Sequence, residues 1–315
     1  MQSHKATITP EFHVNRALLF AFAFFFGLSP ANAQPAKLKL TDAKVLTADH
    51  VYKKTAEGEL SLHCFMPADL KATDNRPVIV FFFGGGWKTG SYTQFVPQAE
   101  YFASRGIVAI SADYRIESKH KTKPDAAVED AKTAIRWVRA NAAKLGIDPD
   151  KVIASGGSAG GHLAAATALV EKFDAADDPK ASCKPNALVL FNPFLNGKGR
   201  TMVGSDGSNI AEAISPTLFL KKDAPPCVIF FGTSDAMLDM GKEYVAKCKE
   251  LGVKVELHTA AEQPHGFFNR EPWLSVTTRK ADEFLTGLGY LKGEPTIKLL
   301  EKAPELKHET VTTKP

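Results

Sequence analysis

Residues 156–160 read Gly-Gly-Ser-Ala-Gly, and they lie between the apolar run 152–154 (VIA) and the helix-forming run 162–166 (HLAAA). This order predicts a strand, then a tight turn that carries Ser158, then a helix. A side chain in such a turn adopts a strained backbone conformation, so the residues two positions before and after it must bring no bulk. The turn can therefore hold a serine hydroxyl exposed as a nucleophile.

A Gly-x-Ser-x-Gly pattern alone is weak, because roughly one chain in ten of this length carries one by chance. The surrounding elements strengthen it. The run 77–83 (PVIVFFF) has the length of a strand covered on both faces, and 124–144 has the apolar spacing of a helix. Further strands are predicted at 43–53, 58–66, 106–112, 151–155, 187–191, 227–231 and 253–259, and further helices at 94–105, 239–250 and 273–288. This alternation predicts a mostly parallel eight-stranded sheet with helices on both faces.

The composition is that of a globular protein with a large core. The chain has 315 residues, of which 44% are hydrophobic and 23% charged. The formal net charge of +4 is small and scattered, and no basic patch is interleaved with aromatic residues, so a nucleic-acid partner is not expected. We expect one domain over residues 34–290 and an extended C-terminal tail, mixed in charge and rich in proline, over 291–315.

Residues 1–33 have the pattern of an export signal. Lys5 and Arg16 precede the apolar stretch 17–28, and Ala31-Asn32-Ala33 fits the small-x-small cleavage pattern, with cutting expected after the last of these. As a helix, the apolar stretch would be about 18 Å long, against a hydrocarbon core of roughly 30 Å. We therefore expect a periplasmic or secreted protein without stable membrane insertion after cleavage. An uncleaved anchor is the alternative.

Four cysteines follow the leader: Cys64, Cys183, Cys227 and Cys248. None forms a C-x-x-C pair, which argues against metal and thioredoxin chemistry. An exported protein allows disulfides. Cys227 starts a predicted strand and Cys248 ends the helix that follows, so the two could lie at the same end of the domain. Because a sheet and a helix packed on it are about 10 Å apart, a disulfide between them is only marginally possible. Four buried thiols are the alternative.

Acyl transfer to a serine needs a general base, a carboxylate that orients it, and donors for the developing oxyanion. The expected base is His265, which lies in a loop just past a predicted strand. His162 follows Ser158 on its own helix and would be carried away from the hydroxyl. The two other candidates are His258, inside a strand, and His308, in the tail.

The expected orienting acid is Asp235, because it follows the apolar run 227–231 (CVIFF) at the carboxyl end of a strand, where sites in such sheets collect. Its competitor, Asp239, falls inside the next helix. One oxyanion donor is expected from the amide of Ala159, at the start of a helix. The other source is the segment 83–87 (FGGGW), whose three glycines let amides face the site. No phosphate-loop pattern can be aligned there.

Several motifs occur in one order along residues 45–290: GGGW at 84–87, DYR at 113–115, a helix with Ala134 and Trp137, GGSAGGHLA at 156–164, GTSD at 232–235 and HGFF at 265–268. In this combination the chain resembles the α/β-hydrolase superfamily, and within it the hormone-sensitive-lipase-like esterases and the related bacterial acetyl and feruloyl esterases. The resemblance implies Ser158 as nucleophile, Asp235 as orienting acid and His265 as base. It also implies that Gly85, Gly86 and Ala159 supply the oxyanion amides, with Gly84 supporting the turn.

The chain departs from the family pattern in two places. The family usually has histidine where this chain has Phe83, a change that bears on loop geometry and catalytic efficiency rather than on the mechanism. Many relatives also carry a helical cap before the sheet, for which residues 34–77 leave no room. No large cap domain is therefore expected, and any lid must come from the loop 193–217.

These inferences predict an exported serine carboxylic-ester hydrolase that acts through an acyl-enzyme and needs no metal or cofactor. Its expected substrate is a short-chain acyl ester or an acetyl or feruloyl ester on a carbohydrate such as a polysaccharide. One alternative is a serine peptidase or amidase on the same fold. Another is a non-catalytic binding protein that has kept a hydrolase fold.

Overall fold

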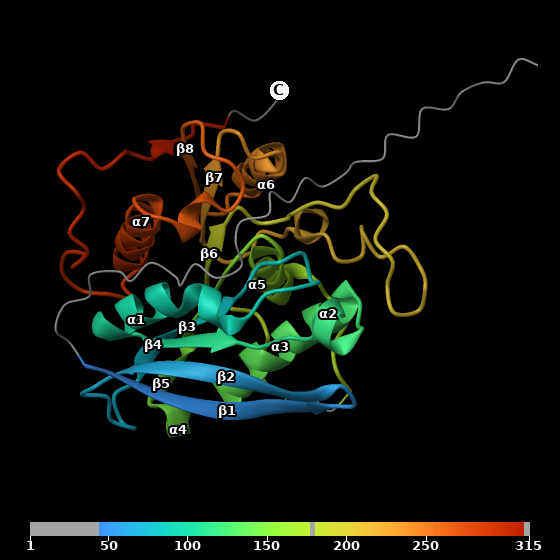
Figure 1. Cartoon of the computed structure of the whole chain (residues 1–315), viewed down its shortest axis with the longest axis horizontal. Coiled ribbons are helices and arrows are strands. Elements are labelled where there is room, and N and C mark those ends of the chain that lie inside the picture. The colour runs from blue at the N-terminus through green and yellow to red at the C-terminus, as the bar shows by residue number, and fades with distance from the viewer. Residues whose placement is uncertain (1–43, 177–179, 312–315) are drawn as a thin grey trace, which may run out of the picture. The chain divides into compact units, whose positions relative to one another are not determined.

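The computed structural model describes residues 44–176 and 180–311 of the chain (Figure 1). The predicted leader, residues 1–33, lies outside the described residues. None of the helices in the described part has the length and hydropathy of a membrane-spanning segment.

The described residues form one sheet in the order β1-β2-β4-β3-β5-β6-β7-β8-β9. The strands are β1 (Val45–Thr55), β2 (Gly58–Pro67), β3 (Arg76–Phe82), β4 (Val108–Ala112), β5 (Ile147–Gly157), β6 (Ala187–Phe191), β7 (Cys227–Gly232), β8 (Val255–Ala260) and β9 (Lys307–His308). The six strands from β4 to β8 in this order are parallel, whereas β1, β2 and β9 pair antiparallel at the two edges. The mostly parallel sheet is confirmed, and it has nine strands instead of eight.

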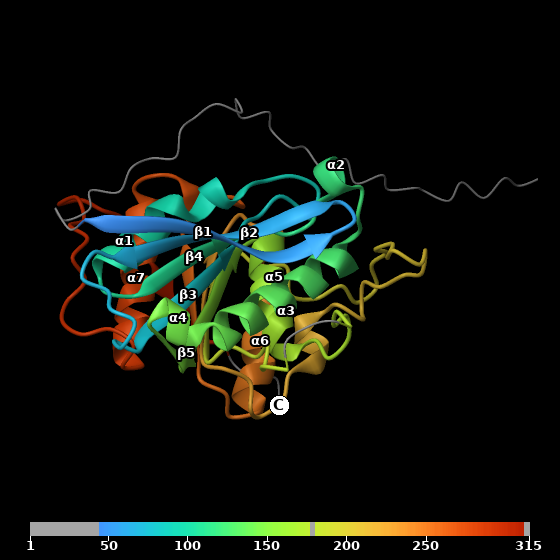
Figure 2. The ribbon, with the colours of Figure 1, turned by 90° about the horizontal axis from the view of Figure 1, so that it is seen from below.

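Helices cover both faces of the sheet, as Figure 2 shows. Along β3, Val78 and Val80 point into a core with α3 (Pro124–Ala140), α5 (Ala159–Leu169) and α6 (Leu238–Glu250). The intervening Ile79 and Phe81 point into a second core with α1 (Val96–Ser104) and α7 (Trp273–Gly287). Because successive strand residues face opposite sides, a strand covered on both faces must be apolar throughout. The run 77–83 is apolar for this reason.

The parallel strands end at one rim of the sheet. β3, β5, β6, β7 and β8 are neighbours and run in the same direction, so the loops that follow them gather at that rim. In open α/β sheets, ligands bind beside the carboxyl ends of the strands. The glycine segment, Ser158, Asp235 and His265 all follow these strands.

Two predicted helices are interrupted in the structure. The helix expected over 124–144 ends at Ala140, and a short α4 (Ala142–Leu145) follows. Asn141 separates them, and its side-chain amide donates to the Trp137 carbonyl at 2.8 Å. Such a side chain offers the backbone an alternative to the helical ladder. The helix expected over 94–105 is the 3₁₀ turn η1 (Tyr92–Phe95) followed by α1, with Pro97 in the first turn of α1.

The C-terminal segment is attached to the domain along its described length, residues 291–311. Leu291 and Ile297 are buried in the core beneath α1 and α7. In β9, Lys307 and His308 pair with Thr259 and His258 of β8. The added strand covers a sheet edge that would otherwise present unpaired backbone groups. The boundary at residue 290 stays a prediction, but the segment does not extend away from the domain as a tail.

The four cysteines are free thiols. Cys64, Cys227 and Cys248 are buried, and burial raises the pKa of Cys64 and of Cys248 to about 12. Thiols with so high a pKa are inert, because the thiolate is the reactive form. The marginal bridge between Cys227 and Cys248 is not formed, and the alternative of four buried thiols is correct for three of them, because Cys183 is only half-buried.

Candidate active site

Ser158 occupies the turn between β5 and α5 in a strained conformation, with φ +54° and ψ −117°. The flanking glycines make this turn possible. A Cβ added at Gly160 would lie 1.9 Å from the Phe82 carbonyl oxygen, and one added at Gly156 would lie 2.5 Å from it. Any side chain at either position would therefore collide with backbone. The two glycines let the turn pack against the end of β3 and present the serine at the rim.

The loops after β5, β7 and β8 bring three polar side chains into one hydrogen-bonded row. Ser158 Oγ lies 2.9 Å from His265 Nε2, and His265 Nδ1 lies 2.7 Å from Asp235 Oδ2. The Asp235 side chain is 1% exposed, whereas that of His265 is 36% exposed. Asp235 Oδ1 also accepts the Met237 amide proton at 2.9 Å, which fixes the carboxylate. With Nδ1–H donating to Asp235, Nε2 has a lone pair that can take the Ser158 proton.

The structure separates the competing residues from this row. His258 lies in β8 and contacts Glu256 at 3.1 Å, and His308 lies in β9. Asp239 is in the first turn of α6 with its side chain 94% exposed. His162 is on α5, and its Nε2–H donates to the Ile214 carbonyl at 2.7 Å. Of the candidates named from the sequence, only His265 and Asp235 contact each other.

His162 makes the stability of the fold depend on pH. Its ring is completely buried, and burial lowers the pKa of His162 from 6.5 to about 4, while the hydrogen bond to Ile214 opposes that shift. Between pH 6.5 and about 4, the His162 ring is protonated in the unfolded chain but stays neutral in the folded chain. The free energy of unfolding should therefore fall as pH decreases from about 6.5 to about 4, by about 3 kcal/mol from this group.

The neutral variant His162→Gln removes this titration. The free energy of unfolding is measured with urea at pH 7, 5.5 and 4.5. It should fall more steeply with decreasing pH in the wild-type protein than in the variant, and the difference in slope should correspond to the uptake of up to one additional proton on unfolding. Parallel pH dependences of the two proteins would contradict the assignment.

The segment after β3 presents amides beside the serine. Gly85 and Gly86 have positive φ values of +122° and +64°, which glycine adopts without strain. A Cβ added at Gly84 would lie 3.4 Å from Ser158 Cβ, so the segment and the serine are in close contact. Among the described residues, no acceptor is bonded to the amides of Gly85, Gly86 or Ala159. These three predicted donors are therefore free of a described acceptor, and their role toward an oxyanion stays a prediction.

An aromatic pair holds Phe83, the residue at the usual histidine position. The Phe83 ring stacks on Tyr114 with 4.1 Å between ring centroids, and the Tyr114 hydroxyl donates to the Phe83 carbonyl at 2.7 Å. Both side chains are buried. Arg115, the residue after Tyr114, donates two hydrogen bonds to the carboxylate of buried Asp130, at 2.8 and 2.9 Å. Tyr114, the middle residue of the motif DYR at 113–115, thus holds the start of the glycine segment.

Asn192, at the end of β6, contacts the same histidine, and the sequence reasoning did not identify it. Its Oδ1 accepts the Gly266 amide proton at 3.1 Å, and its Nδ2 lies 3.3 Å from His265 Nε2. The residue has a positive φ of +36°, and non-glycine residues in this region cluster at functional sites. Its place directly after a buried parallel strand was the one available signal.

The loop expected to supply any lid, residues 193–217, is held against the domain by several contacts, among them the His162 bond to the Ile214 carbonyl. At its base, Phe194 packs edge-on against Trp87, with 5.6 Å between ring centroids. Near its tip, the Ser205 amide and hydroxyl donate to Asp125 in the first turn of α3, at 3.1 and 3.0 Å. The segment contains the short turn η2 (Pro216–Phe219). A substrate-covering role for the loop stays a prediction.

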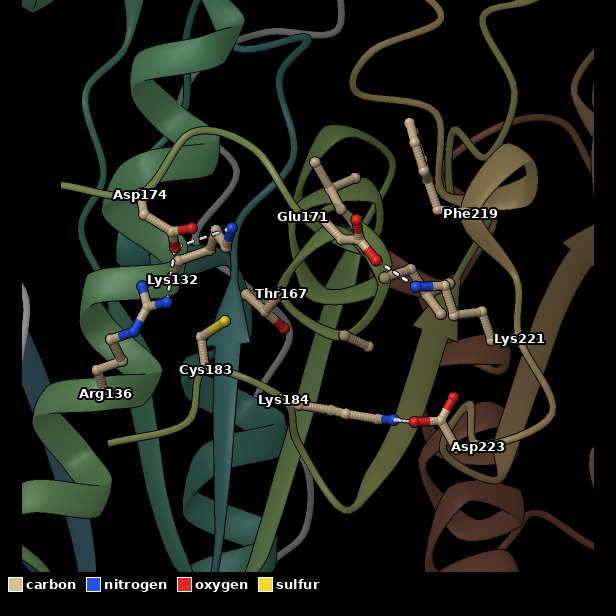
Figure 3. A pocket seen from close by; sticks show the side chains of 13 residues that line it. Lys132, Arg136, Thr167, Glu171, Asp174, Cys183, Lys184, Phe219, Lys221 and Asp223 are labelled. Atoms are coloured by element: carbon tan, nitrogen blue, oxygen red, sulfur yellow. Dashed lines mark hydrogen bonds and ion pairs between the residues drawn. The ribbon is translucent and has the colours of Figure 1, made fainter. Parts of the chain in front are cut away.

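A pocket of about 300 Å³ lies at the opposite end of α5 from Ser158 (Figure 3). Its charged side chains pair with one another: Lys132 and Arg136 with Asp174, Lys184 with Asp223, and Lys221 with Glu171. The length of α5 separates this pocket from the serine by about 16 Å. The pocket is therefore separate from the row of Ser158, His265 and Asp235. Among the described residues, no group of three or more His, Cys, Asp or Glu side chains could hold a metal ion.

Comparison with known families supports the same fold. Residues 62–191 match the BD-FAE family, and residues 211–269 match the alpha/beta hydrolase fold family. The chain is 29% identical to the carboxylesterase NlhH of Mycobacterium tuberculosis over 241 residues, which cover 70% of this chain and 74% of NlhH.

Solved structures of Thermogutta terrifontis esterase 2 are more similar. The form phosphorylated by paraoxon is 42% identical, covers 79% of this chain and 96% of that chain, and has a TM-score of 0.75. The propionate-bound form is also 42% identical, with a TM-score of 0.73, and covers 80% of this chain and 96% of that chain.

Proposed function

We propose that this chain forms its acyl-enzyme on Ser158. The chain belongs to the hormone-sensitive-lipase-like branch of the α/β-hydrolase family, and it is a carboxylesterase-type serine hydrolase. One observation carries the proposal. Ser158 Oγ, the His265 ring and the Asp235 carboxylate lie in a single row, with contacts of 2.9 and 2.7 Å.

In the proposed acylation, His265 Nε2 takes the Ser158 proton while Oγ attacks the ester carbonyl carbon. The carbonyl oxygen becomes an oxyanion and accepts hydrogen bonds from the amides of Gly85, Gly86 and Ala159. The C–O bond to the alcohol then breaks, and His265 returns the proton to the departing alkoxide. Asp235 holds the ring in the required tautomer and stabilises the imidazolium.

Deacylation repeats these steps with water in place of the serine. His265 takes a proton from the water as its oxygen attacks the acyl carbon. The bond to Ser158 Oγ breaks, the proton returns to that oxygen, and the acid leaves. The products are one alcohol and one carboxylic acid, and the serine is restored.

The proposed substrate is an ester of a short acyl group, or an acetyl or feruloyl ester on a carbohydrate. Two observations support it. Residues 45–67 form only the strands β1 and β2, so no helical cap precedes β3 in the described chain. The Thermogutta terrifontis esterase 2, 42% identical, has been described with propionate bound.

Aryl esters of graded chain length test the acyl preference. We expect kcat/KM to be highest for acetyl to butyryl esters and to fall for longer chains, because a site without a cap gives a long chain little apolar surface. A preference for decanoyl esters would contradict the proposal. The same assay on acetylated and feruloylated sugars, with Ser158→Ala as the blank, separates carbohydrate esters from simple ones.

We also propose that the protein is exported. The support is the pattern of residues 1–33, with two basic residues, a short apolar stretch and a small-residue cleavage site. N-terminal sequencing of protein from the periplasm or the culture medium should begin at Gln34. A chain that retains the leader in those fractions would contradict the predicted cleavage, and protein found in the cytoplasm alone would contradict export.

A further inference from the structure

Two carboxamides connect the glycine segment after β3 to the histidine loop after β8. Gln94, in η1, accepts the Gly84 amide proton through Oε1 at 2.6 Å. Its Nε2 donates to Asn269 Oδ1 at 3.1 Å, across 175 residues of sequence. Asn269 Nδ2 in turn donates to the Gly266 carbonyl at 2.9 Å. The row therefore runs from the oxyanion segment to the residue next to His265.

The bonding partners fix the orientation of both amides. Gly84 offers a donor, so Gln94 must present oxygen to it, and the Gly266 carbonyl requires a nitrogen from Asn269. The remaining Gln94 nitrogen and Asn269 oxygen then face each other as donor and acceptor. Reversing either amide would place two donors or two acceptors together. The row has one consistent arrangement, and it consumes the Gly84 amide while leaving those of Gly85 and Gly86 available.

An aromatic contact joins the same two segments one residue away. Phe95 follows Gln94, Phe268 precedes Asn269, and their rings stack with centroids 5.8 Å apart. A Cβ added at Gly157 would lie 2.5 Å from Phe268 and 3.4 Å from Phe95. The two rings therefore pack directly beneath the serine turn. The stacked rings of Phe95 and Phe268 set the distance between the two segments, and the hydrogen bond between Gln94 and Asn269 sets their alignment along the chain.

We propose that Gln94 and Asn269 are positioning residues that hold the oxyanion amides at a set distance from the His265 ring. This inference rests on the proposed function of the site. The amides and the base lie on separate loops, and both must reach the same tetrahedral centre. A misplacement of about 1 Å can lower the rate about 100-fold. The clasp, defined as Gln94 with Asn269, opposes such drift by joining the two loops through hydrogen bonds.

Single and double variants test the clasp. Gln94→Ala and Asn269→Ala should each lower kcat about 10- to 100-fold and change KM by less than about threefold, because transition-state geometry is lost while substrate binding is kept. The double variant should be no slower than the slower single variant, since either change breaks the same row.

Gln94→Glu tests whether the bond from Gln94 to Asn269 is needed or whether the bond to the Gly84 amide alone is sufficient. A glutamate still accepts the Gly84 proton but offers Asn269 no donor. We expect it to lose kcat almost as Gln94→Ala does. Wild-type kcat in Gln94→Glu would overturn the clasp, because the Gly84 bond alone would then suffice.

Asn141→Ala is the matched control, since it removes a half-buried amide that bonds a backbone carbonyl at the far end of α3. It should keep wild-type kcat. Multiplying losses in the double variant, or kcat losses that track the thermal midpoint in all variants, would overturn the proposal in favour of independent structural effects. Ser158→Ala in the same series keeps the questions apart, because the proposed function fails only if that variant stays active.

Discussion

Replacing Ser158 with alanine should lower kcat by about 10⁶-fold and leave the fold intact. The hydroxyl is the only group lost, and its described side-chain contact is with His265 at 2.9 Å. Without it, neither the acyl-enzyme nor the first proton transfer can form. Steady-state hydrolysis of p-nitrophenyl acetate measures the loss, and circular dichroism with a thermal melt reports the fold.

Ser275→Ala is the control for the serine substitution, because the Ser275 hydroxyl, in the first turn of α7, donates to Glu271 at 2.7 Å and belongs to no part of the row. It should retain full kcat. If Ser158→Ala kept a tenth of the wild-type rate, Ser158 would not be the nucleophile.

Asp235→Asn should lower kcat about 10⁴-fold, whereas Asp239→Asn should change it by less than about twofold. An asparagine at 235 can donate to His265 Nδ1, which moves the ring proton to Nε2 and leaves no base facing Ser158. Asp239, four residues later, has a side chain that is 94% exposed and lies 3.4 Å from Lys242. Both substitutions remove one carboxylate charge, so the pair controls for charge alone.

The comparison uses kcat at the pH optimum of the wild-type enzyme, with stability measured for each variant. Similar losses in the two variants would mean that a general electrostatic effect had been mistaken for orientation of the ring. A large loss confined to Asp239→Asn would reassign the acid.

The strands and the row of three side chains could be predicted because local rules decide them. β6 spans 187–191, as predicted, because an apolar run bounded by turn residues has few alternatives. The sequence favours Asp235 over Asp239 because parallel strands carry their sites at their carboxyl ends. His265 followed from the same rule, since it lies in the loop after β8 and not within a helix.

The supporting residues could not be predicted, because nothing local distinguishes them. Gln94, Asn192 and Asn269 are single amides without a sequence pattern, and their partners lie up to 175 residues away. β9 is two residues long and has no strand signature of its own; it forms because β8 leaves an edge to be paired. Phe83 could be noted as a departure, but its stacking on Tyr114 depends on how β3 and β4 pack.

Covalent labelling with paraoxon tests the central claim most directly, namely that His265 activates Ser158 at the rim of the sheet. Peptide mass spectrometry should find one diethylphosphoryl group per chain, on the peptide that contains Ser158. The adduct should be absent from Ser158→Ala and should form far more slowly in His265→Ala, while Asp239→Asn labels at the wild-type rate. A diethylphosphoryl group on any other residue, or labelling at Ser158 that is as fast without the imidazole, would contradict the claim.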